Sequence, residues 1–204
     1  LWTWGDNHYG KLGDGTWEFQ RDHPVRIGSD NDWAAVEAGE NHTVALKSDG
    51  SLWVWGYALG GYGVGGTPIN WNVPTCVLGD SKWIAVSAGF NHTLAIKEDG
   101  SLWGWGWNSK GQLGSSVADF YVDFTEEPVQ VSAEQWAAVS AGDEFTIGLK
   151  ADGSLWAWGW NNVGQLGDGS VADKSIPIRI GSDTWLAAVA GADHVIAIKA
   201  DGSL

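Results

Sequence analysis

A five-residue motif, Leu-Trp-x-Trp-Gly, recurs along the chain at nearly constant spacing. It begins at Leu1, Leu52, Leu102 and Leu155, so successive copies start 51, 50 and 53 residues apart. The spacing divides the 204 residues into repeats 1–51, 52–101, 102–154 and 155–203, and a fifth copy opens at the last residue. A period of this length that fills the chain indicates an array of one supersecondary unit, stacked on copies of itself.

The order of features inside each repeat favours β-strands. In the first repeat a Gly-rich turn (10–13) is followed by a Trp with small residues (33–39). An apolar segment (43–47) then closes on Asp49-Gly50. The apolar runs are short and bounded by Gly, Asp, Asn and Pro, which is typical of strands. Asp-Gly between two apolar runs predicts a hairpin, because Gly accepts the positive φ of the turn.

Four short strands per repeat predict one antiparallel sheet, and sheets packed face to face around an axis make a β-propeller. Trp accounts for 16 of the 204 residues, and three recurrent positions per repeat hold most of them. We expect these large rings to fill the wedge that widens outward between blades, and the small residues at 34–39 to lie near the axis. The sequence therefore predicts an all-β propeller in one region, 1–204, with one four-stranded blade per repeat.

The full order, LWxWGxNxxGQLGDG…P…W…VxAGxxHTxALKxDGS, resembles the repeat of RCC1-type propellers, the family named after the regulator of chromosome condensation. The resemblance covers all four copies. The family commonly forms a ring of about seven four-stranded blades, and its members act mostly by binding. The resemblance thus implies a non-enzymatic scaffold for protein–protein interaction. Four blades predict an arc of a larger ring, in a piece of a longer chain. A closed four-bladed ring and completion by self-association are the alternatives.

Charge and composition exclude several classes of partner. The net charge is −14 at pH 7, which opposes binding to nucleic acid and to anionic membranes. No apolar run is long enough for a membrane helix. The single Cys76 excludes an intrachain disulfide and is expected to be a small core residue. The low Cys content and the loosely varying repeats resemble a bacterial surface or secreted protein.

Two sets of residues invite a chemical interpretation that their pattern argues against. His42, His92 and His194 share one motif position, but the third repeat has Phe145 there, so we expect a packing position and no metal site. The Asp-Gly loops lack the spacing of a calcium-binding EF-hand loop. Motifs for a catalytic serine, a phosphate loop, a dinucleotide fold or a zinc protease are missing from the sequence. We therefore expect no catalytic residues and no cofactor.

The positions that vary between repeats are the candidate partner-binding residues. Light-sensing members of the family carry Trp at the two positions between Ala-Gly and His-Thr; no Trp stands there in this chain. Those positions include Glu40, Asn41, Phe90, Asn91, Asp143, Glu144 and Asp193. A second variable loop carries Phe120, Tyr121 and Phe124. Aromatic residues among acids are typical of a recognition surface, here for a basic protein partner. A carbohydrate-binding propeller is the alternative.

Overall fold

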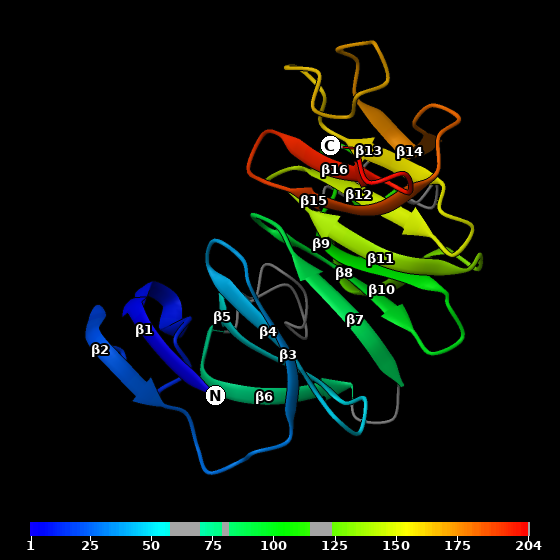
Figure 1. Cartoon of the computed structure of the whole chain (residues 1–204). Helices are drawn as coiled ribbons and strands as arrows, with labels where there is room; N and C mark the ends of the chain where they lie inside the picture. The colour runs from blue at the N-terminus through cyan, green and yellow to red at the C-terminus, as the bar shows by residue number, and fades with distance from the viewer. Residues whose placement is uncertain (58–69, 79–81, 115–123, 204) are drawn as a thin grey trace.

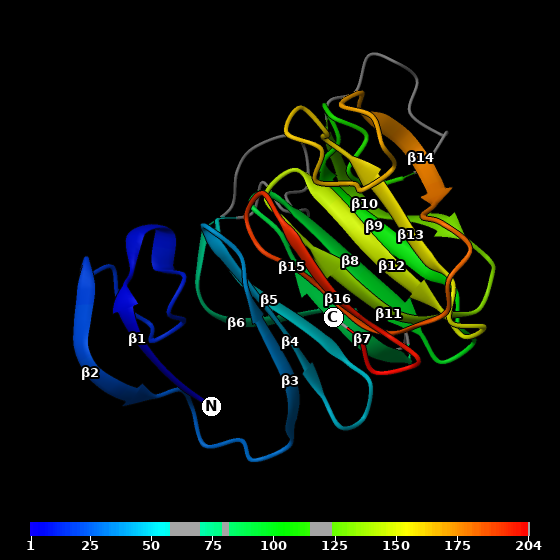
Figure 2. The same ribbon diagram turned by 45° about the horizontal axis from the view of Figure 1, so that its top comes forward.

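The structure, a computed structural model, describes residues 1–57, 70–78, 82–114 and 124–203. In these ranges the chain forms strands and one short 3-10 helix, η1 (His8–Gly10), which confirms the all-β prediction. No helix in this part of the chain has the length and apolar character needed to cross a membrane. The sheets follow one another along an arc, with the first and last strands at its two ends (Figures 1 and 2).

Three antiparallel sheets are complete blades of four strands each. The first contains β3 (Trp33–Ala38), β4 (His42–Lys47), β5 (Leu52–Tyr57) and β6 (Asn70–Leu78). The second contains β7 (Trp83–Ala88), β8 (His92–Lys97), β9 (Leu102–Trp107) and β10 (Phe124–Ser132). The third contains β11 (Trp136–Ala141), β12 (Phe145–Lys150), β13 (Leu155–Gly159) and β14 (Lys174–Arg179).

Two further pairs of strands, one at each end of the arc, are half-blades. They are β1 (Trp2–Asp6) with β2 (Gln20–Arg26), and β15 (Trp185–Ala190) with β16 (Val195–Lys199). The expected strands are all present, but each complete blade joins the end of one repeat to the beginning of the next. The reason is the Asp-Gly hairpin: it pairs β4 with β5 across the repeat boundary, in the register His42↔Gly56. Four repeats therefore make three complete blades and two halves.

The hydrophobic core lies between neighbouring blades. Val44 and Leu46 of β4 pack with Trp83 and Val86 of β7, and the same arrangement recurs between the second and third blades. The second Trp of each motif is fully buried in the complete blades: Trp55, Trp105 and Trp158. Because each blade covers the face of the next, the predicted packing of large rings between blades is confirmed.

In the three complete blades, the first Trp of the motif takes part in a stack with a lysine. Lys150 Nζ lies 5.1 Å from the ring centroid of Trp136 and 3.6 Å from that of Trp156. Lys47 and Lys97 make the same pair of contacts in their own blades. A cation over an aromatic face is attracted by the ring quadrupole. Each complete blade thus ties its innermost strand to its third strand through one lysine.

Cys76 is exposed, so the expectation of a core cysteine is wrong. It lies on β6, the outermost strand of its blade, opposite Trp53. An outermost strand has no further strand beside it and leaves part of its side chains in solvent. Composition indicates that a lone cysteine is usually buried, but it does not show which strand of the blade carries it.

Candidate functional site

The short connections that follow the innermost strands bring several candidate residues together. Glu40, Phe90 and Asp143 come from three successive blades and line one depression of about 580 Å³. The residues at the ends of β3, β7, β11 and β15 form the rest of its wall, and apart from Glu37 and two valines they are small, as expected for residues near the axis. We call this hollow the axial depression. Phe90 remains 39% exposed in it.

Backbone hydrogen bonds hold these connections side by side. The Phe90 N–H donates to the Asp143 carbonyl at 3.2 Å, and the Asp143 N–H donates to the Ala192 carbonyl at 3.1 Å. The connection of the second blade is thus tied to that of the third, and the connection of the third blade to that of β15–β16. The side chains at these positions are consequently presented from a rigid rim, which lowers the entropy lost when a partner binds.

The acidic side chains of the axial depression have raised pKa values because they are buried and lie near one another. Burial, together with the nearby carboxylates of Asp193 and Glu40, raises the pKa of Asp143 above its ordinary value. Burial also raises the pKa of Glu37, which lines the same depression from β3. The negative charges of Asp193 and Glu40 lie close enough to Asp143 to disfavour its ionisation. A cation placed among them would relieve this repulsion.

Glu37 is a site residue that sequence reasoning missed. It stands in the run of small residues before Ala-Gly, where the other repeats have Ser87, Ser140 and Val189. In two of those repeats the serine has a structural role, because Ser87 Oγ accepts from the Ala141 N–H at 3.0 Å and Ser140 Oγ accepts from the Ala190 N–H at 2.9 Å. An acid at a position otherwise taken by small or apolar residues is the signal that could have found it.

The second residue of each variable pair has a different role from the first. The carbonyls of Asn41, Asn91 and Glu144 accept backbone N–H groups from Tyr57, Trp107 and Trp160 at 2.7, 2.8 and 2.9 Å. These bonds close each connection onto the strand that carries the Leu-Trp-x-Trp-Gly motif. Asn41, Asn91 and Glu144 do not line the axial depression, whereas Asp193 acts on it through its charge.

The recurrent histidine joins neighbouring blades, as a packing position would. His42 Nε2 lies 3.0 Å from Thr93 Oγ1, and His92 Nε2 lies 3.1 Å from Thr146 Oγ1. Burial lowers the pKa of His42 to about 4. Burial, with a smaller contribution from His42, lowers the pKa of His92 to about 3. Both rings are therefore neutral at pH 7. In the described ranges, no three His, Cys, Asp or Glu side chains are grouped as metal ligands.

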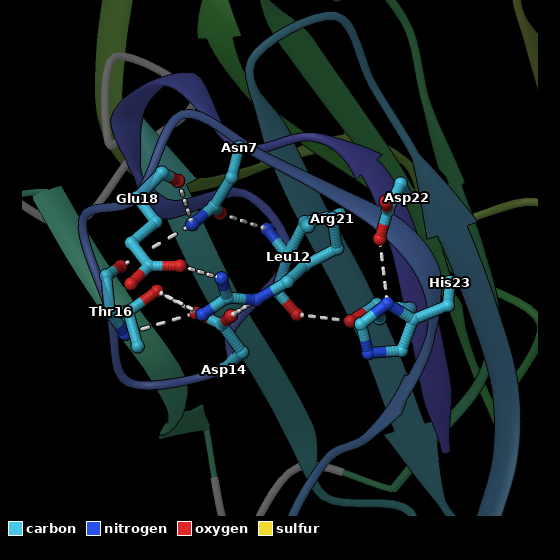
Figure 3. A network of polar contacts seen from close by, with 9 residues as sticks. Asn7, Leu12, Asp14, Thr16, Glu18, Arg21, Asp22 and His23 are labelled. Carbon is cyan, nitrogen blue, oxygen red and sulfur yellow. Dashed lines mark hydrogen bonds and ion pairs between the residues drawn. The ribbon is translucent and has the colours of Figure 1, made fainter.

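The variable loop after the Gly-rich turn is held by side-chain contacts in the first repeat (Figure 3). Asn7 Oδ1 accepts from the Leu12 N–H at 3.0 Å, and Arg21 Nε donates to Asp14 Oδ2 at 2.6 Å. Burial alone would raise the pKa of Asp14, but hydrogen bonds from Thr16 and Arg21 hold it below its ordinary value. The carboxylate of Asp14 therefore stabilises this turn through its hydrogen bonds.

Of the second candidate surface, Phe120, Tyr121 and Phe124, the structure describes only Phe124. Phe120 and Tyr121 lie outside the described residues. Phe124 begins β10, where it pairs with Trp107 and is half-buried. The structure therefore assigns Phe124 to the outermost strand of the second blade, away from the residues that line the axial depression.

Comparisons with known proteins agree with this architecture. A profile described as "Regulator of chromosome condensation (RCC1) repeat" matches residues 1–46, 49–96, 99–149 and 152–198. The ultraviolet-B receptor of Arabidopsis thaliana is 31% identical over 183 residues, which cover 84% of this chain and 40% of the receptor. A retinitis pigmentosa GTPase regulator homologue of Caenorhabditis elegans is 39% identical over 88 residues, covering 39% of this chain and 6% of that protein.

Solved structures show the same fold over about half their length. Human WBSCR16 superposes with a TM-score of 0.84 at 22% identity, covering 97% of this chain and 52% of that chain. Prp20p of Saccharomyces cerevisiae gives a TM-score of 0.80 at 18% identity, covering 96% and 50%. The chain spans less than half the length of the curated relatives named above.

These relatives come from a plant, a nematode, human and yeast, and they do not support the expected bacterial origin. They include a receptor and a GTPase regulator homologue, and the carbohydrate-binding alternative gains no support from them. The family assignment rests on the four-stranded blades, on their arrangement in a propeller arc, and on the repeat profile, which matches nearly every residue. The chain belongs to the family of proteins built from regulator of chromosome condensation (RCC1) repeats.

Proposed function

We propose that this chain is a non-enzymatic scaffold whose axial depression binds a basic segment of a protein partner. One observation carries the proposal: Glu40, Phe90 and Asp143, from three successive blades, line a single hollow in which the carboxylates already repel one another. The residues that line it are otherwise alanine, glycine, serine and valine, with Glu37 as the further acid.

The chemistry of the depression suits a lysine or arginine side chain. A cation near Asp143 would offset the influence of Glu40 and Asp193 and favour the ionised carboxylate. The net charge of −14 would speed the approach of a basic partner, and more so at low salt. Phe90 supplies an exposed aromatic surface from the blade between those of Glu40 and Asp143, and an aromatic residue there can anchor a partner.

Relatives with this fold support a role in protein binding. Prp20p has binding properties toward Gsp1p and histones, and a second structure shows Kap60 bound to yeast RCC1, the same protein. The shared feature that we transfer is the class of ligand, another protein. The choice of a basic segment rests on the acids of this chain.

The test compares two charge-reversal variants with a decalysine peptide as the probe. Glu40→Lys with Asp143→Lys changes the axial depression. Glu98→Lys with Glu127→Lys changes the net charge equally at exposed positions that do not line the depression. We expect the first pair to weaken binding by at least about tenfold, or roughly 1.4 kcal/mol, and the second pair by much less. Fluorescence titration at two salt concentrations measures both effects.

Equal weakening by the two variants would show that only net charge matters and would contradict the proposal. If neither variant changes the affinity, the result contradicts binding in the axial depression and favours the loop that carries Phe120, Tyr121 and Phe124 as the binding surface. Phe90→Ala tests the anchor separately, because we expect a faster dissociation rate with an unchanged dependence on salt.

A further inference from the structure

The innermost strands β3, β7, β11 and β15 follow one another along the arc and line the axial depression (Figures 1 and 2). We call the contact between β3 and β7 the first seam. The contacts between β7 and β11 and between β11 and β15 are the second and third seams. We propose that the first seam binds the main chain of the partner, so that the axial depression selects a basic peptide over other cations. This inference rests on the proposed function and names the chemistry of its ligand.

One backbone N–H near the end of each innermost strand points out of the strand's own sheet. The Gly89 N–H donates to the His92 carbonyl at 2.9 Å, and bonded and non-bonded pairs alternate along an antiparallel ladder. Ala88, which is opposite Thr93, therefore stands in a non-bonded pair, and its N–H is not used by the ladder. The same alternation leaves the Ala141 N–H of β11 outside its ladder.

A serine supplies the acceptor for this N–H at the second and third seams. Ser87 Oγ accepts from the Ala141 N–H at 3.0 Å, and Ser140 Oγ accepts from the Ala190 N–H at 2.9 Å. The connections that follow these strands are also joined by backbone hydrogen bonds across both seams. At these two seams the protein itself thus provides the partners of its polar groups.

The first seam differs in both respects. Glu37 stands at the position of the two serines, and no side chain in the described ranges accepts from the Ala88 N–H. Among the same residues, no backbone bond joins Glu40 to Phe90, although the corresponding connections are bonded at the other two seams. The first seam is therefore open toward the axial depression, with one backbone donor left for a ligand.

The opening belongs to the sequence of the seam, because both blades beside it are complete. His42 Nε2 lies 3.0 Å from Thr93 Oγ1 across the first seam, much as the equivalent pair does across the second. Val44 and Val86 pack in one core cluster across it. The longer side chain of Glu37 carries its carboxylate beyond the place of a serine hydroxyl. Burial is accordingly the influence that raises its pKa, with no opposing hydrogen bond.

A basic peptide matches the groups that the first seam presents. The Ala88 N–H requires an acceptor, and Glu37 and Glu40 require a cation in the same depression. Phe90, which is 39% exposed, adds an apolar surface. A peptide with lysine or arginine supplies a main-chain carbonyl, a charged group and the methylene groups that precede it. A protonated polyamine supplies the charge and the methylene groups but no acceptor, so it leaves the N–H unbonded.

Two probes of equal charge test this selectivity: a blocked tetralysine peptide, which has main-chain carbonyls, and spermine, which has none. The readout is the ratio of their affinities, measured by fluorescence titration. Glu37→Ser rebuilds the closed seam of Ser87 and Ser140. It should lower the preference for the peptide by about 3–10-fold, the factor that one net hydrogen bond supplies. Glu37→Gln is the matched control, because it removes the charge and keeps the opening. It should weaken both probes and preserve their ratio.

Amide exchange at Ala88 gives a second readout, which needs no ligand. In NMR spectra of the free parent chain, Ala88 should exchange faster than Ala141, because only Ala141 has a serine acceptor. Glu37→Ser should slow exchange at Ala88, and saturating tetralysine should slow it in the parent chain. Circular dichroism verifies that each variant is folded.

The outcomes separate this inference from the proposed function. If tetralysine binds the parent chain but Glu37→Ser leaves the ratio unchanged, the inference is overturned and the proposed function stands. Equal protection of Ala88 and Ala141 in the free parent chain also overturns the inference alone, since the first seam would then be closed. If tetralysine does not bind the parent chain, the proposed function fails and this inference fails with it.

Discussion

The tryptophans of this chain differ in burial, and their contributions to stability should differ accordingly. Trp105 is fully buried between two blades, whereas Trp17 is 57% exposed in the loop before β2. Trp105→Ala should lower the free energy of unfolding by about 3–5 kcal/mol, as large-to-small core substitutions do. Trp17→Ala should cost under about 1 kcal/mol. Urea unfolding at a fixed protein concentration measures both, and equal losses would contradict the assignment of the core.

The buried histidines make stability depend on pH in a direction that follows from their pKa values. The folded-state pKa of His42 is lowered to about 4 and that of His92 to about 3, from an ordinary value near 6.5. The unfolded chain therefore binds more protons than the folded one between these values. Stability is complete above pH 6.5 and falls as the pH drops toward 4. At pH 5 each histidine should cost about 2 kcal/mol relative to pH 8.

Repeat three supplies the variant that tests this effect. Phe145 fills the same position as the histidines and is fully buried, so His42→Phe with His92→Phe should fold. We expect the double variant to lose about 4 kcal/mol less than the parent chain between pH 8 and pH 5, because neither ring can be protonated. Thermal or urea unfolding at the two pH values provides the comparison. A parent-like loss in the double variant would assign the pH dependence to other groups.

At the scale of elements, the turns could be predicted more reliably than the blades. Asp49-Gly50 and its equivalents predict hairpins, and the structure has them, since Gly50 adopts a φ of +82° and its N–H donates to the Lys47 carbonyl. The same hairpin crosses the repeat boundary, so the blade starts in the middle of a repeat. Periodicity shows how long the unit is but not where a sheet begins, because any starting point gives the same period.

The candidate site could be predicted to the level of a strand end. The variable pairs between Ala-Gly and His-Thr mark the right connections, and Glu40, Phe90 and Asp143 line the axial depression. Which member of each pair faces the axis depends on the backbone. In three repeats the second member's carbonyl accepts from the N–H of the residue that directly follows the Leu-Trp-x-Trp-Gly motif. The inclusion of Glu37 depends on the approach of four strands to one axis, which a single repeat does not encode.

For the whole molecule, the stability of an arc is approximately a sum of blades and of interfaces between neighbours. The middle of this chain has neighbours on both sides: β8 and β12 are buried almost throughout. The ends have a neighbour on one side only, and alternate residues of β16 are exposed. The fold therefore has its strongest local support at the centre and its weakest at both half-blades.

Hydrogen exchange should report this gradient residue by residue. In dilute solution we expect the slowest amide exchange in β8 and β12 and the fastest, among the strands, in β1–β2 and β15–β16, because local opening of an end exposes little buried surface. Exchange that is uniform along the strands would show that the arc opens as one unit. Exchange that is slower in the two half-blades than in β8 would contradict the nearest-neighbour account of this arc.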